Sequence, residues 1–214
     1  MSSARLLPLL ICLIAPLLPD TASAHPYSPL RPGDVTVLKY HFGVKDLKPG
    51  VKIDEVNGQM TVTRVGWEEK EGKRYLKSSA SYKDIPYMKE EQYLWRREEG
   101  GAVYMGSYLN DKWSETVELP ADVSLGSEWD YFDGVKSRRK VTATPSVTLE
   151  DGKVLSDCIE VSRTVLNDEK LKTVNNVSVY CRDIGEVSYL FKQPSPLGEY
   201  ITETKMESFK AGAE

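Results

Sequence analysis

Apolar and polar residues alternate along most of the chain after about residue 33, and helical periodicity is almost absent. Alternation with a period of two is typical of strands that bury one face. Turn-forming pairs separate the alternating segments, among them Asn110-Asp111 and Asp151-Gly152. The expected strands cover residues 59–67, 74–82, 87–97, 102–108, 112–119, 140–149, 153–166, 173–182, 186–191 and 199–209. About ten short strands at this spacing predict an all-β fold, a single curved antiparallel sheet that forms a half-barrel or a sandwich.

Two stretches of the chain resemble each other weakly. In the first, Asn57-Gly58 precedes a strand, a turn at 71–73 and a second strand. In the second, Asp151-Gly152 precedes a strand, a turn at Asn167-Asp168 and another strand. A glycine and an aromatic strand precede each block, at 33–42 and at 126–132. This pattern favours two half-repeats in one sheet, although any β-meander shows some self-similarity.

The first 24 residues have the pattern of a secretory signal peptide. Arg5 precedes an apolar run at 6–18, and Ala22-Ser23-Ala24 is a small-x-small cleavage motif. Cys12 follows Leu-Leu-Ile rather than small residues, so we expect no lipid anchor. The predicted organisation is therefore a signal peptide at 1–24, an extended arm at 25–32, an all-β domain at 33–209 and a disordered tail at 210–214.

The formal net charge of −4 argues against nucleic acid or anionic lipid as the main partner. Outside the leader, no segment has the length and apolarity of a transmembrane helix. We therefore expect a protein that is periplasmic or secreted and that does not insert in the membrane after cleavage. The sequence gives no reason to expect a cofactor.

Two cysteines follow the leader, and their even number in an oxidising compartment predicts a Cys158–Cys181 disulfide. The strand pattern argues against this bridge. Ile159 and Val161 alternate on one strand, and 177 and 179 on the other. Pairing those apolar faces puts the cysteines on opposite faces, so a bulge or non-adjacent strands would be needed. Two buried free thiols are the alternative.

Several phrases resemble a family of uncharacterised secreted bacterial proteins. They are the stretch Leu119–Asp133, the strand Asp157–Val161 and the segment Tyr93–Tyr104. The chain departs from the family pattern at Tyr180–Val187. The resemblance implies a curved antiparallel half-barrel in the envelope, similar in outline to periplasmic lipoprotein carriers. It brings no catalytic residues.

Two enzymatic hypotheses have candidate residues. Cleavage after Ala24 would give His25 a free α-amine beside its ring, and His41 could add a third nitrogen, a ligand set that suits Cu(II). The carboxylate pairs 68–69, 90–91 and 98–99 are the candidates for a hydrolase. Neighbouring residues on a strand point to opposite faces, so solvated edges are the simpler interpretation of these pairs.

Aromatic residues concentrate in the first two thirds of the chain. On a curved sheet they could line a pocket for a lipophilic molecule or a carbohydrate, or they could be ordinary core and cross-strand pairs. The candidate lining residues are Trp67, Trp95, Trp113, Trp129, Tyr93 and Tyr104. We predict an envelope protein that binds an apolar ligand or a partner protein. The alternatives are a secreted enzyme and a structural surface module.

Overall fold

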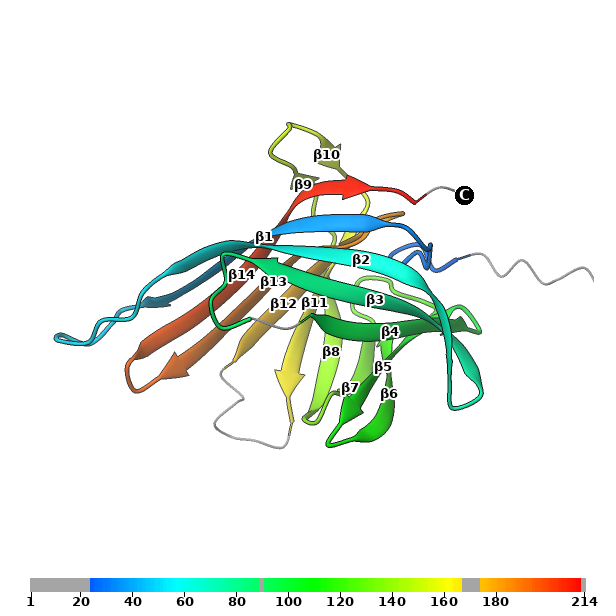
Figure 1. The fold of residues 1–214 in the computed structure, drawn as a ribbon, viewed down its shortest axis with the longest axis horizontal. Coiled ribbons are helices and arrows are strands. Elements are labelled where there is room, and N and C mark those ends of the chain that lie inside the picture. The colour runs from blue at the N-terminus through cyan, green and yellow to red at the C-terminus, as the bar shows by residue number, and fades with distance from the viewer. Residues whose placement is uncertain (1–23, 89–90, 167–173, 213–214) are drawn as a thin grey trace, which may run out of the picture.

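The computed structural model describes residues 24–88, 91–166 and 174–212, and in this part of the chain every regular element is a strand (Figure 1). The predicted all-β class and curved antiparallel sheet are confirmed, with fourteen strands rather than about ten. The strands are β1 (Val35–Lys45), β2 (Val56–Lys70), β3 (Lys73–Lys83), β4 (Gln92–Glu99), β5 (Ala102–Leu109), β6 (Lys112–Leu119), β7 (Glu128–Phe132), β8 (Lys136–Ala143), β9 (Val147–Thr148), β10 (Val154–Leu155), β11 (Cys158–Val165), β12 (Asn175–Cys181), β13 (Gly185–Ser195) and β14 (Gly198–Lys210). Among the described residues, no helix is long and apolar enough to cross a bilayer.

Twelve of the strands form one sheet in the order β6-β5-β4-β3-β2-β1-β14-β13-β12-β11-β8-β7. Strand β1 pairs with β14, so the first and the last strand lie side by side in the middle of the sheet. The sheet curls until its edge strands, β6 and β7, lie near each other (Figure 1). There the amide of Phe132 donates to the Thr116 hydroxyl at 3.0 Å. The result is a nearly closed barrel with a seam between β6 and β7.

The extra strands arise from breaks within the expected segments. Strand β8 ends two residues before Pro145, whose nitrogen has no hydrogen to donate to a strand ladder. The turn at Asp151-Gly152 joins only the short hairpin β9–β10, and Ser156-Asp157 separate that hairpin from β11. Strands β1 and β7, which follow Gly33 and Gly126, complete the sheet.

The strand order has two halves of six strands, β1–β6 and β7–β14 without the β9–β10 hairpin. The two similar blocks of sequence do not occupy matching places in them. The first block is β2–β3, the second and third strands of its half, whereas the second block leads to β11–β12, the third and fourth. The topology thus has two halves, but the two similar stretches of sequence do not correspond to equivalent strands in them.

Two apolar clusters stabilise the barrel. The first joins the two edge regions through residues of β5, β6, β8, β11 and β12, and consists of Tyr27, Val103, Leu119, Val141, Ile159, Val161 and Tyr180. The second lies where the β9–β10 hairpin packs, and consists of Leu38, Leu155, Cys158, Cys181, Val187 and Met206. Every one of these side chains is less than a tenth exposed.

The Cys158–Cys181 disulfide is confirmed, and the expected obstacle to it was wrong. Cys158 and Cys181 pair directly in the β11–β12 ladder, with Cα atoms 4.0 Å apart. In this register Ile159 faces Tyr180 in the first cluster, while Val179 packs on the second. Both faces of these strands are buried, so the alternation of apolar residues does not select one register.

The segment that precedes β1 is docked on the barrel. Its first residues form a turn, in which Ser28 N donates to the carbonyl of His25 at 3.1 Å. The carbonyl of Pro26 accepts from the amide of Asp183, and the Tyr27 hydroxyl donates to Asp157 at 2.7 Å. At the other end of the chain, Gly212 N donates to Asp34 at 2.8 Å. The residues around 25–34 and the last described residues are therefore held by specific contacts.

Candidate functional site

A cavity of about 270 Å³ lies along β1–β4, β6 and the β12–β13 turn. This volume is just below the ~300–1,000 Å³ of typical small-molecule pockets. Its lining contains Ser28, Thr36, Leu38, Met60, Val62, Arg64, Ser78, Ser79, Ala80, Tyr82, Gln92, Tyr93, Leu94, Arg96, Glu118, Tyr180, Ile184, Gly185 and Glu186. One part of the wall is apolar and the other carries charged groups.

The register of β1, β2 and β3 produces the apolar wall. Leu38 pairs with Met60, and Val62 pairs with Ala80, and residues that are directly opposite in a ladder share a face. Strand alternation carries this face along β2 from Met60 to Val62 and on to Arg64. The apolar stripe therefore ends at a guanidinium.

The charged end is built around a buried ion pair between β4 and β6. Arg96 Nε and Nη2 donate to the two carboxylate oxygens of Glu118, at 2.6 and 2.8 Å. The side chain of Glu118 is only 3% exposed. Arg139 of β8 donates to the Glu118 carbonyl at 3.2 Å, across the β6–β7 seam. Burial alone would raise the pKa of Glu118, but the guanidinium of Arg96, together with Arg139 and Arg64, lowers it overall.

A second ion pair, between Arg64 and Asp34, adjoins the first. The side chain of Asp34 is 1% exposed and accepts from Arg64 and, at 3.3 Å, from Arg31. Arg64 also donates to the carbonyl of Ile184 at 3.3 Å. Burial and the like charge of Arg96 lower the pKa of Arg64 to about 10, so the guanidinium stays protonated at neutral pH.

Glu186 is the ionisable group of the cavity lining whose charged form is least stabilised by its surroundings. Burial raises its pKa, and the negative charge of Glu118 adds to this effect. The guanidinium groups of Arg96 and Arg139 and a hydrogen bond from Ser178 oppose the rise without cancelling it. Burial also raises the pKa of the neighbouring Tyr180 hydroxyl. The cavity thus offers guanidinium donors, a carboxyl that resists ionisation and a phenol.

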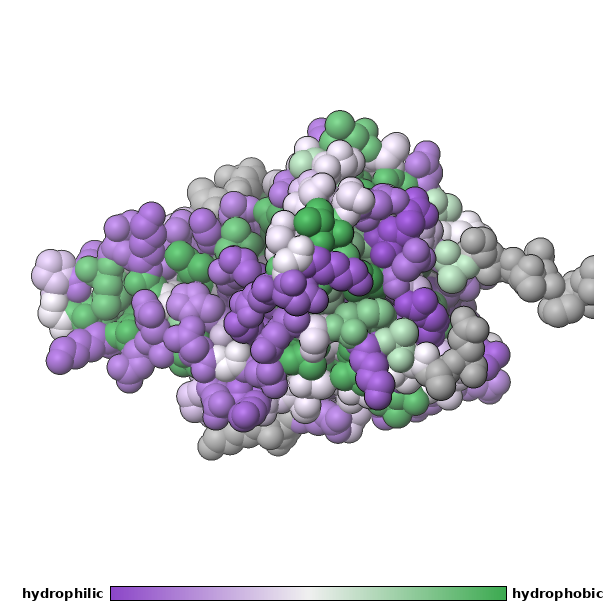
Figure 2. Space-filling model, turned by 90° about the horizontal axis from the view of Figure 1, so that it is seen from above, coloured by the Kyte–Doolittle hydropathy of each residue, from purple (hydrophilic) through white to green (hydrophobic). Residues whose placement is uncertain are grey.

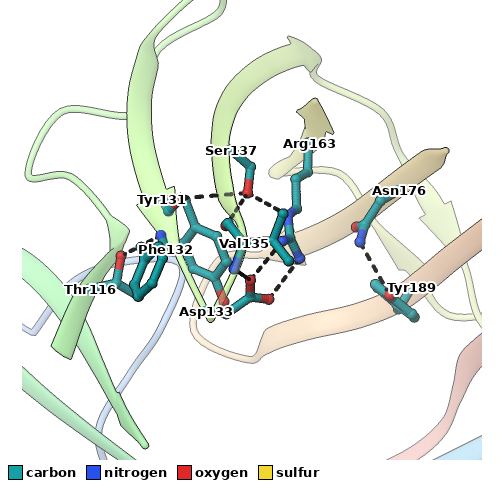
Figure 3. Close-up of polar contacts among 9 residues, drawn as sticks. All are labelled: Thr116, Tyr131, Phe132, Asp133, Val135, Ser137, Arg163, Asn176 and Tyr189. Carbon is teal, nitrogen blue, oxygen red and sulfur yellow. Dashed lines mark hydrogen bonds and ion pairs between the residues drawn. The ribbon is translucent and has the colours of Figure 1, made fainter. Parts of the chain in front are cut away.

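A separate polar cluster fastens the β7–β8 turn to β11 (Figure 3). Arg163 binds both carboxylate oxygens of Asp133 at 2.7 Å and donates to Ser137 at 2.9 Å. Beside it, Asn176 of β12 donates to the Tyr189 hydroxyl of β13 at 3.2 Å. Arg163 and Asp133 satisfy each other, so this cluster is structural.

Of the six aromatic residues predicted to line a pocket, Tyr93 borders the cavity, but its side chain lies on the same face of β4 as Trp95, with the two ring centroids 6.4 Å apart. Trp95 and Trp113 belong instead to an aromatic cluster on the opposite face of β3–β6. Their ring centroids are 5.6 Å apart, and Tyr108 packs against both. A Cβ at Gly106 would lie 2.2 Å from the Trp113 ring, so this packing requires glycine there.

The remaining three residues lie apart from one another. Tyr104 lies under the guanidinium of Arg97, at 4.2 Å from the ring centroid. Trp67 is 41% exposed under Arg74, and Trp129 packs against the first apolar cluster. Most of the predicted set therefore serves cross-strand packing and cation–π contacts rather than this cavity.

The two histidines have different surroundings. The Nδ1 atom of His25 accepts from the amide of Tyr27 at 3.2 Å, and its Nε2 lies 3.1 Å from the carbonyl of Pro120. Burial lowers the pKa of His25, and the nearby carbonyl and carboxylates offset this only in part. His41 lies on β1, with Nδ1 3.0 Å from Asn57. Within the described residues, no three His, Cys, Asp or Glu side chains form a metal-ligating group.

Most carboxylates of the candidate pairs that the structure describes take part in hydrogen bonds or ion pairs. Glu68 accepts from Trp95 and pairs with Lys70, and Glu99 pairs with Arg97. Glu98 accepts from the backbone of His25. Glu90 lies outside the described residues.

The alternation did not predict the charged lining residues, because it assigns inward-facing positions to apolar side chains, whereas Gln92 and Arg96 of β4 both line the cavity. Arg64 carried a signal, since it shares a strand face with Met60 and Val62. The partners of these charges come from strands distant in sequence, so the sequence alone does not show which charges meet.

No protein-family model and no curated protein sequence matches the chain. Two solved structures resemble its fold. One is described as a putative lipoprotein from Parabacteroides distasonis, with a TM-score of 0.50 and 14% identity over 87% of this chain and 99% of that one. The other is described as a putative exported protein with YmcC-like fold from Bacteroides fragilis, with a TM-score of 0.50 and 11% identity over 87% of this chain and 100% of that one. Both agree with the resemblance to uncharacterised bacterial proteins rich in β-structure.

Proposed function

We propose that this protein is exported to the cell envelope or beyond it and binds a small amphiphile inside the barrel. The apolar part of the ligand contacts Leu38, Met60 and Val62, and its polar group lies near Arg96 and Glu186. The leader-like sequence before His25 and the descriptions of the two structural neighbours as exported or lipoprotein support the location.

The observation that carries the proposal is the meeting of an apolar wall and buried charges in one cavity. Buried charges are costly unless they are paired, and a barrel interior is more simply filled by apolar side chains. Here the pairs Arg96–Glu118 and Arg64–Asp34 lie beside open volume rather than in close packing. Mostly apolar walls with a few converging polar groups are the usual composition of a ligand pocket.

Two substitutions on the same strand test this assignment. Val62 lines the cavity, whereas Val65, three residues later, is 58% exposed. Val62→Phe adds a ring to the cavity volume, and Val65→Phe adds the same ring at the surface. Binding of a dansylated undecanoic acid is followed by its fluorescence, with circular dichroism as the check on folding.

We expect Val62→Phe to weaken binding by about tenfold or more, equivalent to ~1.4 kcal/mol. Val65→Phe should stay within about twofold of the unsubstituted protein, as is typical of surface changes. Equal binding by both folded variants would place the ligand elsewhere and leave binding of a partner protein as the better account.

A further inference from the structure

The backbone nitrogen of His25 occupies a buried position beside a carboxylate. It lies 3.0 Å from Glu98 Oε2 on β4, and His25 is only 1% exposed. The hydrogen bonds of its ring to Tyr27 and Pro120 hold the residue in this place. The residue before it, Ala24, is exposed.

The Glu98 carboxylate is incompletely satisfied by this contact. Its other oxygen, Oε1, is buried, and no donor among the described residues meets it. A buried acceptor without a partner costs about 1–3 kcal/mol, and such groups are rare in folded proteins. A backbone amide has one hydrogen, so it serves only one of the two oxygens.

We infer that the chain is cut between Ala24 and His25, and that the new α-ammonium group of His25 forms an ion pair with both oxygens of Glu98. The cut is a hydrolysis by a signal peptidase. One water is consumed, Ala24 keeps a carboxylate on the released leader, and His25 gains an amine that takes up a proton. The ammonium has three hydrogens, which supply Oε2 and the unpaired Oε1 together.

Two independent observations agree on this bond. The sequence before it, Ala22-Ser23-Ala24, has the small residues that signal peptidases recognise. The structure places the nitrogen of the following residue, His25, against the unsatisfied carboxylate. Because His25 is buried when docked, the cut precedes docking, and the charge made by the cut then fastens the segment.

The ion pair would strengthen one end of the barrel. Tyr27, two residues further on, is part of the first apolar cluster, and Ser28 belongs to the cavity lining. Fastening His25 therefore fastens a part of the cavity wall. The same pairing engages the α-amine that a copper site at His25 would require.

The test compares chains that differ in where they begin. The protein is exported to a bacterial periplasm, and its intact mass is measured. Chains that begin at His25 or at Thr21 are also released from a fusion protein, each with and without Glu98→Gln. The Thr21 chain keeps the amide hydrogen of His25 but has no charge there. The difference between the two chains therefore measures the effect of the ammonium charge.

We expect the exported mass to correspond to 25–214, and the His25 chain to unfold about 2–4 °C above the Thr21 chain. With Glu98→Gln this difference should disappear. As a measurement that needs no substitution, an amine-acylating reagent at neutral pH should modify the α-amine of the folded Thr21 chain and spare that of the His25 chain. A different exported N-terminus, equal melting of the two chains, or equal acylation would overturn the inference.

Discussion

At the scale of single residues, the unusual feature of this protein is the group of ionised side chains inside a barrel. Arg96 and Glu118 illustrate how the group is tolerated: each of the two charges is met by the other in a bidentate geometry. Such pairs add little net stability when intact, yet the loss of one partner leaves an uncompensated buried charge.

Arg96→Met should therefore destabilise the protein strongly, by about 3–5 kcal/mol. The matched control is Arg138→Met, which removes the exposed pair with Asp130 and should cost less than about 1 kcal/mol. Urea unfolding of both variants measures the difference. Similar losses in the two variants would contradict a buried role for Arg96.

For Glu186 we predict the opposite effect, that removal of the charge stabilises the protein. Its pKa is raised by burial, so the folded state favours the protonated carboxyl. The stability it contributes is present below the unfolded pKa and is lost as pH rises through the folded pKa. Glu186→Gln should thus raise the melting temperature at pH 7 and change it little near pH 4. The exposed Glu71 is the control, and Glu71→Gln should leave the difference between the two pH values unchanged.

The contacts of individual side chains are also what the sequence predicts least well. Alternation along the chain puts Arg64 on the same strand face as Met60 and Val62, but its partner, Asp34, lies outside the expected strands. The tryptophans and tyrosines predicted to line a pocket mostly have other roles. Trp95 and Trp113 pack edge to face against each other instead of facing the cavity.

At the scale of elements, the disulfide ties the strands β11 and β12 at one end of their ladder. Both sulfurs are buried in the second apolar cluster, under the β9–β10 hairpin. The Cys158→Ala/Cys181→Ala variant should lose about 3 kcal/mol, from the chain-entropy estimate for a closed loop of this length.

Chemical unfolding with and without a reductant checks this value. Reductant should lower the midpoint of the unsubstituted protein to that of the variant and leave the variant unchanged. A variant as stable as the oxidised protein would contradict the estimate.

The same two strands show what alternation can and cannot predict. It identified most strands of the barrel, for example β6, whose bounds match the expected segment 112–119. It could not give the register of β11 and β12, because the hairpin covers the face that would otherwise be exposed. Where both faces are buried, contacts from distant parts of the chain set the register.

At the scale of the whole molecule, the sheet combines a nearly closed barrel with an open extension. The barrel seam lies between β6 and β7, whereas the paired ends of β1–β2 and β13–β14 extend beyond the barrel (Figure 1). Seen from above, this extension carries hydrophobic residues flanked by hydrophilic ones (Figure 2). The overall class followed from the sequence, but the cavity depends on how far the sheet curls, which no local pattern encodes.

Native mass spectrometry tests the central claim, that the barrel interior holds a small amphiphile, most directly. The protein is exported to a bacterial periplasm, purified without detergent and measured before and after incubation with excess dansylated undecanoic acid. We predict one bound molecule on the unsubstituted protein and on Val65→Phe, and none on Val62→Phe. An unsubstituted protein that carries no adduct under these conditions would contradict the account.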